Sequence, residues 1–332
     1  MKICICGGGN LGHVCAGFLA NRGHQVSILT TRPERWNTEL EIVAPDGTFT
    51  GKLNLISSRP EEVIPQVEIV LVCLPGYAIH DELVKIRPFL SKETIVGSVV
   101  SSTGFFFEAL KVLPPDIPLF GFQRVPFISR IIEYGKKAEL KGYKDTLHVA
   151  IENTLDKEPI RDELKRLFEK PVSIADSYYE VSLSNSNPLL HPARLYTMWK
   201  DWQPGIVYPR NPQFYAEWTI EASAFLIQMD DEFQQLLKAL GLKTGCIPTI
   251  LDYYESSDAI SLTQKLHDIR AFQGILSPMK EVEGGWIPDF SSRYFTEDFP
   301  YGMRFLVETA HKQGVAIPTI EKVYQWGLSK TI

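Results

Sequence analysis

The sequence predicts a doubly wound parallel α/β domain followed by an all-α domain. In the first half of the 332-residue chain, short runs of Val, Ile and Leu alternate with amphipathic segments, which is typical of parallel strands joined by crossover helices. In the second half, apolar residues recur at helical spacing without strand alternation. The length also exceeds what a single core usually fills. We therefore expect two domains, residues 1–180 and 181–332.

The strands expected in the first domain are short aliphatic runs at 2–6, 25–29, 68–74, 94–99 and 119–122. Helices are expected at 11–21 and 79–89, and the Asp46-Gly47 pair predicts a hairpin turn. In the second domain, one buried helical stripe is predicted from six apolar residues, namely Phe214, Trp218, Phe225, Met229, Phe233 and Leu237.

Composition excludes several classes of protein. The net charge of -6 offers no general attraction for nucleic acid or anionic lipid. The longest apolar stretches have the length of strands and fall short of the roughly 20 residues that a membrane span needs. Lys2 leads directly into a strand-like run instead of an apolar leader. We expect a cytoplasmic protein that binds neither nucleic acid nor membrane.

The five cysteines lie in apolar segments, without the paired spacing of zinc sites or disulfide frameworks. They are interpreted as buried, reduced thiols. Cys4 and Cys6 are the one close pair, and we expect their sulfurs to point to opposite faces of the strand. No metal site is therefore expected.

A glycine motif, Gly7-x-Gly9-x-x-Gly12, lies between the first predicted strand and the first predicted helix, which is the context that this pattern requires. Gly7 allows the tight turn, Gly9 lets the backbone approach a pyrophosphate, and Gly12 lets helix and strand pack closely. The backbone amides that begin the helix, at Asn10 and Leu11, would face the anion. The motif predicts a dinucleotide site of the Rossmann type.

The end of the second predicted strand bears on the choice of cofactor. NAD enzymes usually carry an acidic residue there to bind the ribose hydroxyls, whereas this sequence has Thr31 and Arg32, followed by Arg35. Hydroxyls and cations suit a 2′-phosphate, so we favour NADP over NAD. The alternative is that Arg32 is a solvated loop residue. Pro75, after the strand at 68–74, is expected to shape the wall beside the nicotinamide.

Hydride transfer to a carbonyl or imine needs a proton donor, and histidine is suited because it titrates near neutrality. Among the seven histidines, His191 stands out because it lies where the strand-rich half gives way to helices. Pro188 and Pro192 flank it and fit a segment that begins a helix. His191 is therefore the candidate proton donor.

These residues resemble those of the opine dehydrogenase family, which includes the octopine and nopaline dehydrogenases. The resemblance covers most of the chain. It is carried by Gly7 to Gly12, Pro75, Gln123-x-x-Pro126-Phe127-x-x-Arg130, Asn185-x-Asn187-x-x-x-His191-Pro192 and Arg293-Tyr294-Phe295-x-Glu297-Asp298. Phe127 departs from the family, because many relatives have tryptophan at this position.

The resemblance implies a Rossmann domain joined to an all-α domain similar to the C-terminal domain of 6-phosphogluconate dehydrogenase, with the active site between them. It implies NAD(P)H-dependent condensation of an α-keto acid with the amino group of an amino acid. His191 would donate the proton and polarise the carbonyl, and Asp298 would orient and charge the imidazole. From the residues alone, a helix cap before Phe299-Pro300 is the better interpretation of Asp298, and the matched motif reverses this preference.

Substrates of this kind carry carboxylates, which arginine binds with a two-pronged fork. Arg130, Arg194 and Arg293 are the candidates, although each could instead form a structural ion pair. Gln123 follows a predicted strand and is expected to contact substrate or nicotinamide. Asn187, in the His191 motif, is a further candidate for substrate binding.

Two other functions stay open. One is a keto-acid reductase similar to ketopantoate reductase, in which a lysine, Lys200 or Lys265, would donate the proton. The other is a non-catalytic redox sensor that binds NADP(H). A homodimer formed through the helical domain is a further expectation.

Overall fold

The computed structural model describes residues 1–330. The chain divides after Ser184 into two compact units, a few residues beyond the boundary expected at 180. Each unit is described by itself.

The first unit is built around an eight-stranded sheet with the order β12-β11-β8-β7-β6-β1-β2-β5. The strands are β1 (Lys2–Cys6), β2 (Gln25–Leu29), β5 (Leu55–Ser57), β6 (Ile69–Val72), β7 (Ile95–Ser98), β8 (Leu119–Phe122), β11 (Leu147–Glu152) and β12 (Val172–Ile174). From β5 to β8 every neighbouring pair is parallel, whereas β11 joins β8 antiparallel. The predicted doubly wound arrangement is confirmed, because the chain leaves β1 toward β2 and later returns to its other side at β6.

The helices of this unit are α1 (Asn10–Asn21), α2 (Pro60–Val63), α3 (Gly76–Ile86), α4 (Phe105–Val112), α5 (Glu158–Phe168) and α6 (Tyr178–Leu183). The helix expected at 79–89 begins earlier, directly after Pro75, and ends in a 3-10 turn at Arg87–Phe89. This early start brings the N-terminus of α3 to the carboxyl edge of the sheet.

The two faces of the main sheet are both buried. Ile3 and Ile5 of β1 belong to one apolar cluster, and Cys4 and Cys6 belong to the other. The expectation that the two sulfurs diverge is therefore wrong: residues two apart in a strand share a face, and the Sγ atoms lie 3.8 Å apart. Contact with the Cys4 thiol, together with burial, raises the pKa of Cys6. Both sulfurs belong to the apolar core.

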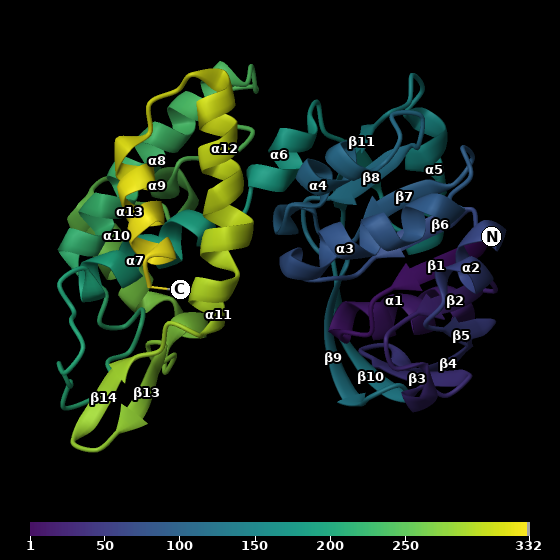
Figure 1. Ribbon diagram of the computed structural model, residues 1–332, viewed down its shortest axis with the longest axis horizontal. Coiled ribbons are helices and arrows are strands. Elements are labelled where there is room, and N and C mark those ends of the chain that lie inside the picture. The colour runs from purple at the N-terminus through teal and green to yellow at the C-terminus, as the bar shows by residue number, and fades with distance from the viewer. Residues whose placement is uncertain (331–332) are drawn as a thin grey trace. The chain divides into compact units, whose positions relative to one another are not determined.

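A second sheet with the order β4-β3-β10-β9 covers α1 on the side away from the main sheet (Figure 1). Its strands are β3 (Glu39–Ala44), β4 (Gly47–Lys52), β9 (Phe127–Glu133) and β10 (Lys137–Tyr143). The hairpin predicted at Asp46-Gly47 is confirmed, with Ala44 opposite Gly47. Gly17 permits the close contact, because a Cβ there would lie 2.5 Å from the side chain of Ile42.

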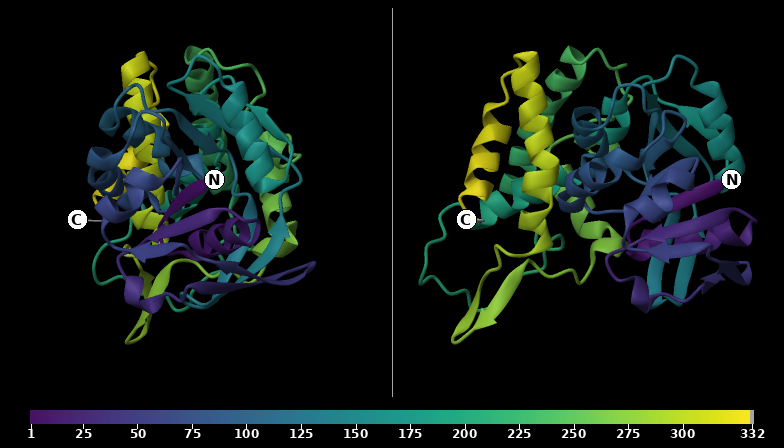
Figure 2. Two further views of the ribbon diagram at one scale, coloured as in Figure 1. Left: turned by 90° about the vertical axis from the view of Figure 1, so that its right-hand side faces the viewer. Right: turned by 45° about the vertical axis from the view of Figure 1, so that its right-hand side comes forward.

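The second unit is mainly helical, as predicted. Its helices are α7 (Asn187–Trp199), α8 (Ile220–Ala239), α9 (Ile250–Tyr253), α10 (Ala259–Asp268), α11 (Arg293–Thr296), α12 (Arg304–Gln313) and α13 (Pro318–Leu328), and a π-helical turn, η6 (Phe299–Met303), precedes α12. A hairpin of β13 (Met279–Val282) and β14 (Gly285–Pro288) projects from the helices (Figures 1 and 2). This hairpin was not predicted.

The expected helical stripe is only partly one helix. Met229, Phe233 and Leu237 are buried on α8, whereas Phe214 and Trp218 are buried in the irregular segment before it. The hydroxyl of Thr219 accepts the N–H of Ala222 and so begins α8 after Trp218.

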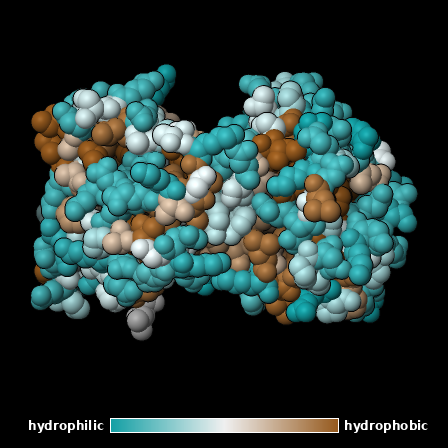
Figure 3. Space-filling model, turned by 90° about the horizontal axis from the view of Figure 1, so that it is seen from above, coloured by the Kyte–Doolittle hydropathy of each residue, from teal (hydrophilic) through white to brown (hydrophobic). Residues whose placement is uncertain are grey.

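Within residues 1–330, no helix combines the length and the apolar composition needed to cross a membrane. On the face seen in Figure 3, hydrophobic side chains occur in small groups among hydrophilic ones.

Candidate active site

The glycine turn between β1 and α1 shows why each glycine is needed. Gly7 has a φ of +117°, and a Cβ there would lie 2.6 Å from the carbonyl oxygen of Cys73. A Cβ at Gly12 would overlap the carbonyl oxygen of Gly7. At Gly9, by contrast, a Cβ would meet no atom within 4 Å. Gly7 and Gly12 are therefore required by the turn itself, and Gly9 faces open space.

That open space lies at the beginning of α1, where the first backbone amides have no partner within the helix. Gly9 is the N-cap residue, followed by Asn10 and Leu11. The side chain of Asn10 is engaged elsewhere, because its Oδ1 accepts the N–H of Ile131 in β9 at 2.8 Å. The main chain of this turn therefore fits a pyrophosphate, which matches the donors expected of the motif.

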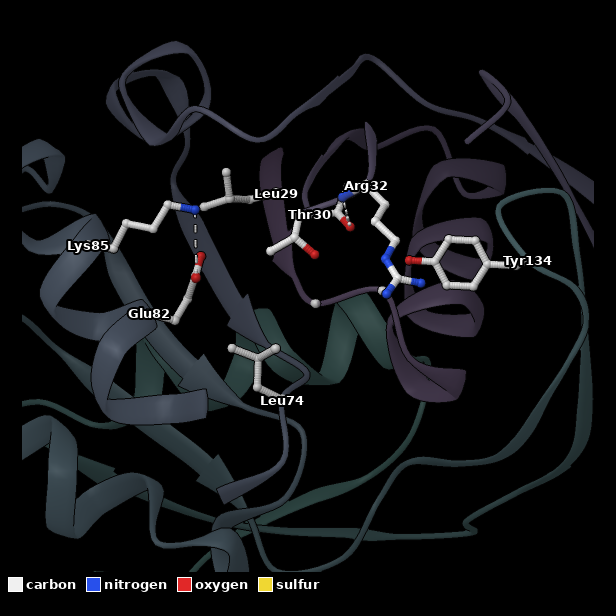
Figure 4. A pocket seen from close by; sticks show the side chains of 10 residues that line it. Leu29, Thr30, Arg32, Leu74, Glu82, Lys85 and Tyr134 are labelled. Carbon is white, nitrogen blue, oxygen red and sulfur yellow. Dashed lines mark hydrogen bonds and ion pairs between the residues drawn. The ribbon is translucent and has the colours of Figure 1, made fainter. Parts of the chain in front are cut away.

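A cavity of about 200 Å³ continues from this turn to the end of β2 (Figure 4). It is lined by Gly7, Gly8, Leu29, Thr30, Thr31, Arg32, Leu74, Glu82, Lys85 and Tyr134. Thr31 and Arg32 were expected here. Arg35 is not among the lining residues, and its guanidinium lies 4.5 Å from the centre of the Tyr134 ring. Pro75 directly follows Leu74 and is the N-cap residue of α3.

The charges of the cavity come from two elements. Arg32 follows β2, and Lys85 and Glu82 project from α3, where they form an ion pair at 3.8 Å. Burial raises the pKa of Glu82, and Lys85 partly opposes this effect. A carboxylate is thus present, although none follows β2. Sequence reasoning missed Glu82, Lys85 and Tyr134, because only the fold brings their elements to the end of β2.

The second unit holds the predicted histidine and aspartate together. Nδ1 of His191, on α7, lies 2.7 Å from Oδ2 of Asp298. Nε2 lies 2.9 Å from the hydroxyl of Tyr215. Because a carboxylate only accepts, Nδ1 carries the hydrogen in the neutral ring, and Nε2 then accepts from Tyr215. Asp298 makes no side-chain capping bond to η6, so the structure does not support the helix-cap interpretation.

Two glycines allow the carboxylate to reach the imidazole. A Cβ at Gly302, in η6, would lie 2.6 Å from the ring of Pro188 in the first turn of α7. A Cβ at Gly327, in α13, would overlap the ring of Phe299, which is fully buried. Phe299, the residue after Asp298, is thus fixed in the core. The π-helical turn η6 that it begins packs tightly on α7, the helix that carries His191.

Aromatic rings surround the imidazole. Phe214, Tyr215 and Tyr294 meet its ring edge-on, with centroids 5.8, 6.4 and 4.7 Å away. Burial raises the pKa of Tyr215 and of Tyr294 above the ordinary value, so both stay neutral phenols at neutral pH. Tyr294 belongs to the quoted motif, but sequence reasoning missed Tyr215, which lies in the irregular segment between α7 and α8.

The three arginine candidates differ. Arg194 is buried, it donates to the carbonyl of Glu217 at 2.5 Å, and burial lowers its pKa to about 10; this geometry favours the structural alternative. Arg293 forms a two-pronged ion pair with Glu297, at 2.9 and 2.8 Å, and its side chain is 83% exposed. Arg130 is exposed on β9.

The two amide candidates lie in different units. Gln123 directly follows β8, is partly buried, and its backbone N–H bonds the carbonyl of His148 at 2.9 Å. Asn187 begins α7, one helical turn before His191. Asn187 therefore shares a helix face with the imidazole.

The lysines of the alternative mechanism are both paired. Lys200 bonds Glu221 at 2.6 Å, which raises its pKa, and Lys265 bonds Glu255 at 2.5 Å. Neither ammonium group is in contact with His191 or Asp298. A raised pKa makes Lys200 a weak proton donor.

Known proteins resemble this chain in sequence and in fold. Residues 174–331 match the sequence model of the alpha-helical domain of NAD/NADP octopine/nopaline dehydrogenases. The second unit is thus similar to the helical domain of opine dehydrogenases. Octopine dehydrogenase of Pecten maximus is 29% identical over 99% of this chain and 90% of its own length. Tauropine dehydrogenase of Arabella iricolor is 27% identical over 97% of this chain and 89% of its own length.

Solved structures extend the family likeness to three dimensions. Octopine dehydrogenase with NADH and L-arginine superposes with a TM-score of 0.87 at 27% identity, covering 99% of this chain and 89% of that one. Residues 3–102 match the ketopantoate reductase model, and a ketopantoate reductase of Ralstonia eutropha has a TM-score of 0.65 at 15% identity, covering 100% of this chain and 98% of that one. The latter likeness concerns the fold alone.

Proposed function

We propose that this protein is an opine dehydrogenase, which condenses an α-keto acid with the amino group of an amino acid and reduces the product with NAD(P)H. The observation that carries the proposal is the 2.7 Å hydrogen bond between His191 and Asp298. It provides a general acid and base with a fixed tautomer in a domain of the octopine dehydrogenase type.

The reaction requires one group that can both take and give a proton. An amino acid arrives as an ammonium ion and must lose a proton before its nitrogen attacks the keto carbon. The carbinolamine that forms must gain a proton on oxygen, so that water leaves and an iminium remains. Bound NAD(P)H supplies the hydride that this carbon accepts, and the secondary amine is the product.

His191 suits both transfers. Nε2 of the neutral ring is a base for the ammonium proton, and the imidazolium that results can return this proton to the departing oxygen. Asp298 holds the Nδ1 hydrogen and stabilises the charge that the ring gains. For Nε2 to contact substrate, the hydroxyl of Tyr215 must yield its place.

For the cofactor we favour NADP, because Arg32 and Lys85 line the cavity at the end of β2 and can bind a 2′-phosphate. Glu82 in the same cavity is the group that would instead accept ribose hydroxyls of NAD. Gly7, Gly9, Gly12, Asn10 and Leu11 would hold the pyrophosphate, with Thr31 and Pro75 beside the two ends of the cofactor.

For the substrates we propose that Arg130 or Arg293 binds a carboxylate, with Gln123 and Asn187 as polar contacts. Arg194 is not proposed to bind substrate, because its guanidinium donates to the carbonyl of Glu217 in the same unit. Five free cysteines suit the reducing cytoplasm, which is where we place the reaction. A homodimer stays a prediction.

The test is a matrix of amino acids against α-keto acids, read by loss of NADPH and NADH absorbance. We expect turnover with at least one pair, a lower KM for NADPH than for NADH, and a loss of kcat of at least about 100-fold in His191→Ala. The matched control is His311→Ala, which removes an exposed histidine of the same unit.

Full activity in His191→Ala would refute the mechanism and favour a lysine-based reductase. Tight dinucleotide binding without turnover in any pair would favour a redox sensor. A lower KM for NADH would overturn the cofactor preference and assign the decisive role to Glu82.

A further inference from the structure

His13 is a fully buried histidine on α1 that the proposed reaction does not use. Its Nδ1 lies 2.9 Å from the carbonyl oxygen of Gly9, and its Nε2 lies 2.7 Å from the backbone nitrogen of Gly135, in the turn between β9 and β10. A carbonyl only accepts and an amide N–H only donates. Nδ1 therefore carries the hydrogen and Nε2 is bare, which defines a neutral ring with one tautomer.

We propose that neutral His13 is a positioning residue for the dinucleotide site: it holds the glycine turn and the β9–β10 turn in the arrangement that the cofactor requires. This inference rests on the proposed nicotinamide-dependent function. It assigns a role to a residue outside the glycine motif.

The hydrogen bond from His13 to the carbonyl of Gly9 affects the direction of a backbone N–H that would bind the pyrophosphate. The carbonyl oxygen of Gly9 accepts both the backbone N–H of His13, at 3.0 Å, and the imidazole. In a trans peptide the C=O and the following N–H point in opposite directions. Holding the Gly9 carbonyl toward the helix therefore aims the N–H of Asn10 out of the helix, into the open space at Gly9.

On the other side, the imidazole holds a wall of the cavity. Gly135 donates to Nε2, and its own carbonyl accepts the N–H of Asn37 at 2.9 Å. Tyr134, the preceding residue, lines the cavity, and a Cβ on Gly8 would lie 2.5 Å from its hydroxyl. His13 thus bonds the main chain of both turns.

The surroundings of His13 keep it neutral. Trp36 stacks on the ring with centroids 4.1 Å apart, and Tyr134 meets it edge-on at 5.0 Å. The charged Arg35 borders this cluster, because its guanidinium lies 4.5 Å from the centre of the Tyr134 ring. Burial lowers the pKa of His13, and the bond to Gly9 acts in the opposite direction. Protonation would place an N–H of the imidazolium against the N–H of Gly135, so the contact to the β9–β10 turn would be lost.

The test separates the two hydrogen bonds. In His13→Asn the amide nitrogen can reach the position of Nδ1 but not that of Nε2, and in His13→Gln the amide reaches only the position of Nε2. His13→Phe keeps a ring for Trp36 to stack on and removes both bonds.

The control is His24→Asn, at the turn after α1 and outside the cofactor site. Binding of NAD⁺ and NADP⁺, which survive acid, is measured by calorimetry from pH 5 to pH 8, and folding by circular dichroism.

We expect the wild-type dissociation constant to be constant above pH 7 and to rise about fivefold toward pH 5, while His24→Asn behaves as wild type. At pH 7.5, Asn and Gln should each weaken binding about fivefold and Phe at least about tenfold, in keeping with one and two lost hydrogen bonds. All three variants should lose the part of the pH dependence that the wild type shows below pH 6.5.

Wild-type affinity in folded His13→Phe would overturn the inference. If this variant does not fold, the Asn and Gln variants decide it by the same criterion. A wild-type protein that binds neither dinucleotide at pH 7.5 would instead overturn the proposed function, so the two failures are distinguishable.

Discussion

At the scale of single residues, the hydroxyl of Tyr215 decides how His191 is held before substrate binds. An imidazole nitrogen has one in-plane direction and holds one partner at a time, and Tyr215 occupies that direction at Nε2. The tyrosine ring is itself held by stacking on Phe272, with centroids 4.0 Å apart. We predict that Tyr215→Phe keeps this stacking, frees the imidazole, and lowers kcat about tenfold with KM values within about twofold.

The control is Tyr294→Phe. Both nitrogens of His191 are engaged by Asp298 and Tyr215, so the hydroxyl of Tyr294 is not needed to hold the ring. Steady-state kinetics across pH 6 to 9 should show a wild-type kcat in this control. A wild-type kcat in Tyr215→Phe would contradict the prediction.

At the scale of elements, the position of Asp298 depends on how α13 receives the π-helical turn. We predict that Gly327→Ala lowers kcat at least about tenfold, because the added Cβ overlaps the Phe299 ring and displaces the adjacent carboxylate. Dinucleotide affinity, which belongs to the other unit, should not change. Gln325→Ala, at an exposed site on the same helix, is the matched control. A parallel loss of dinucleotide binding would point to general unfolding instead.

At the scale of the whole molecule, stability should depend on Asp230, a buried carboxylate on α8. It accepts the N–H of Ile250 at 2.9 Å, and burial raises its pKa to about 6 from the ordinary 3.8. Well below pH 4 the Asp230 carboxyl is protonated in both the folded and the unfolded state, and above pH 6 only the folded state carries the penalty of a buried charge. We predict that Asp230→Asn raises the free energy of unfolding by up to about 3 kcal/mol at pH 7.5 and not at pH 4.

Urea unfolding at the two pH values measures this difference. Asp231→Asn makes the same change of charge at an exposed neighbour, and it should alter stability by no more than about 0.5 kcal/mol at either pH. If the free energy of unfolding of Asp230→Asn at pH 7.5 is equal to or below that of the wild type, burial of the charged carboxylate does not destabilise the fold.

The sequence predicted features that depend on neighbours along the chain. The glycine turn, five of the strands and the Asp46-Gly47 hairpin are local patterns. His191 and Asp298 were found through motifs of a family, not through spacing. The structure then explains their meeting by Gly302 and Gly327, whose importance depends on contacts between distant segments.

Features formed by distant segments were missed for the same reason. The bonds of His13 to both turns, the hydroxyl of Tyr215 and the pair Glu82 and Lys85 become visible only when separate elements meet. The error at Cys4 and Cys6 was of another kind, because strand geometry alone places residues two apart on one face.

The enclosure of α1 between two sheets has a consequence for hydrogen exchange. Residues 12–19 are buried without interruption. Local opening of only one of the two sheets would therefore leave the helix covered by the other. Its amide hydrogens should exchange only when both sheets separate from it, and they should therefore report the largest opening free energy of the unit. The glycine turn proposed to bind the pyrophosphate would thus be attached to the slowest-exchanging part of its domain.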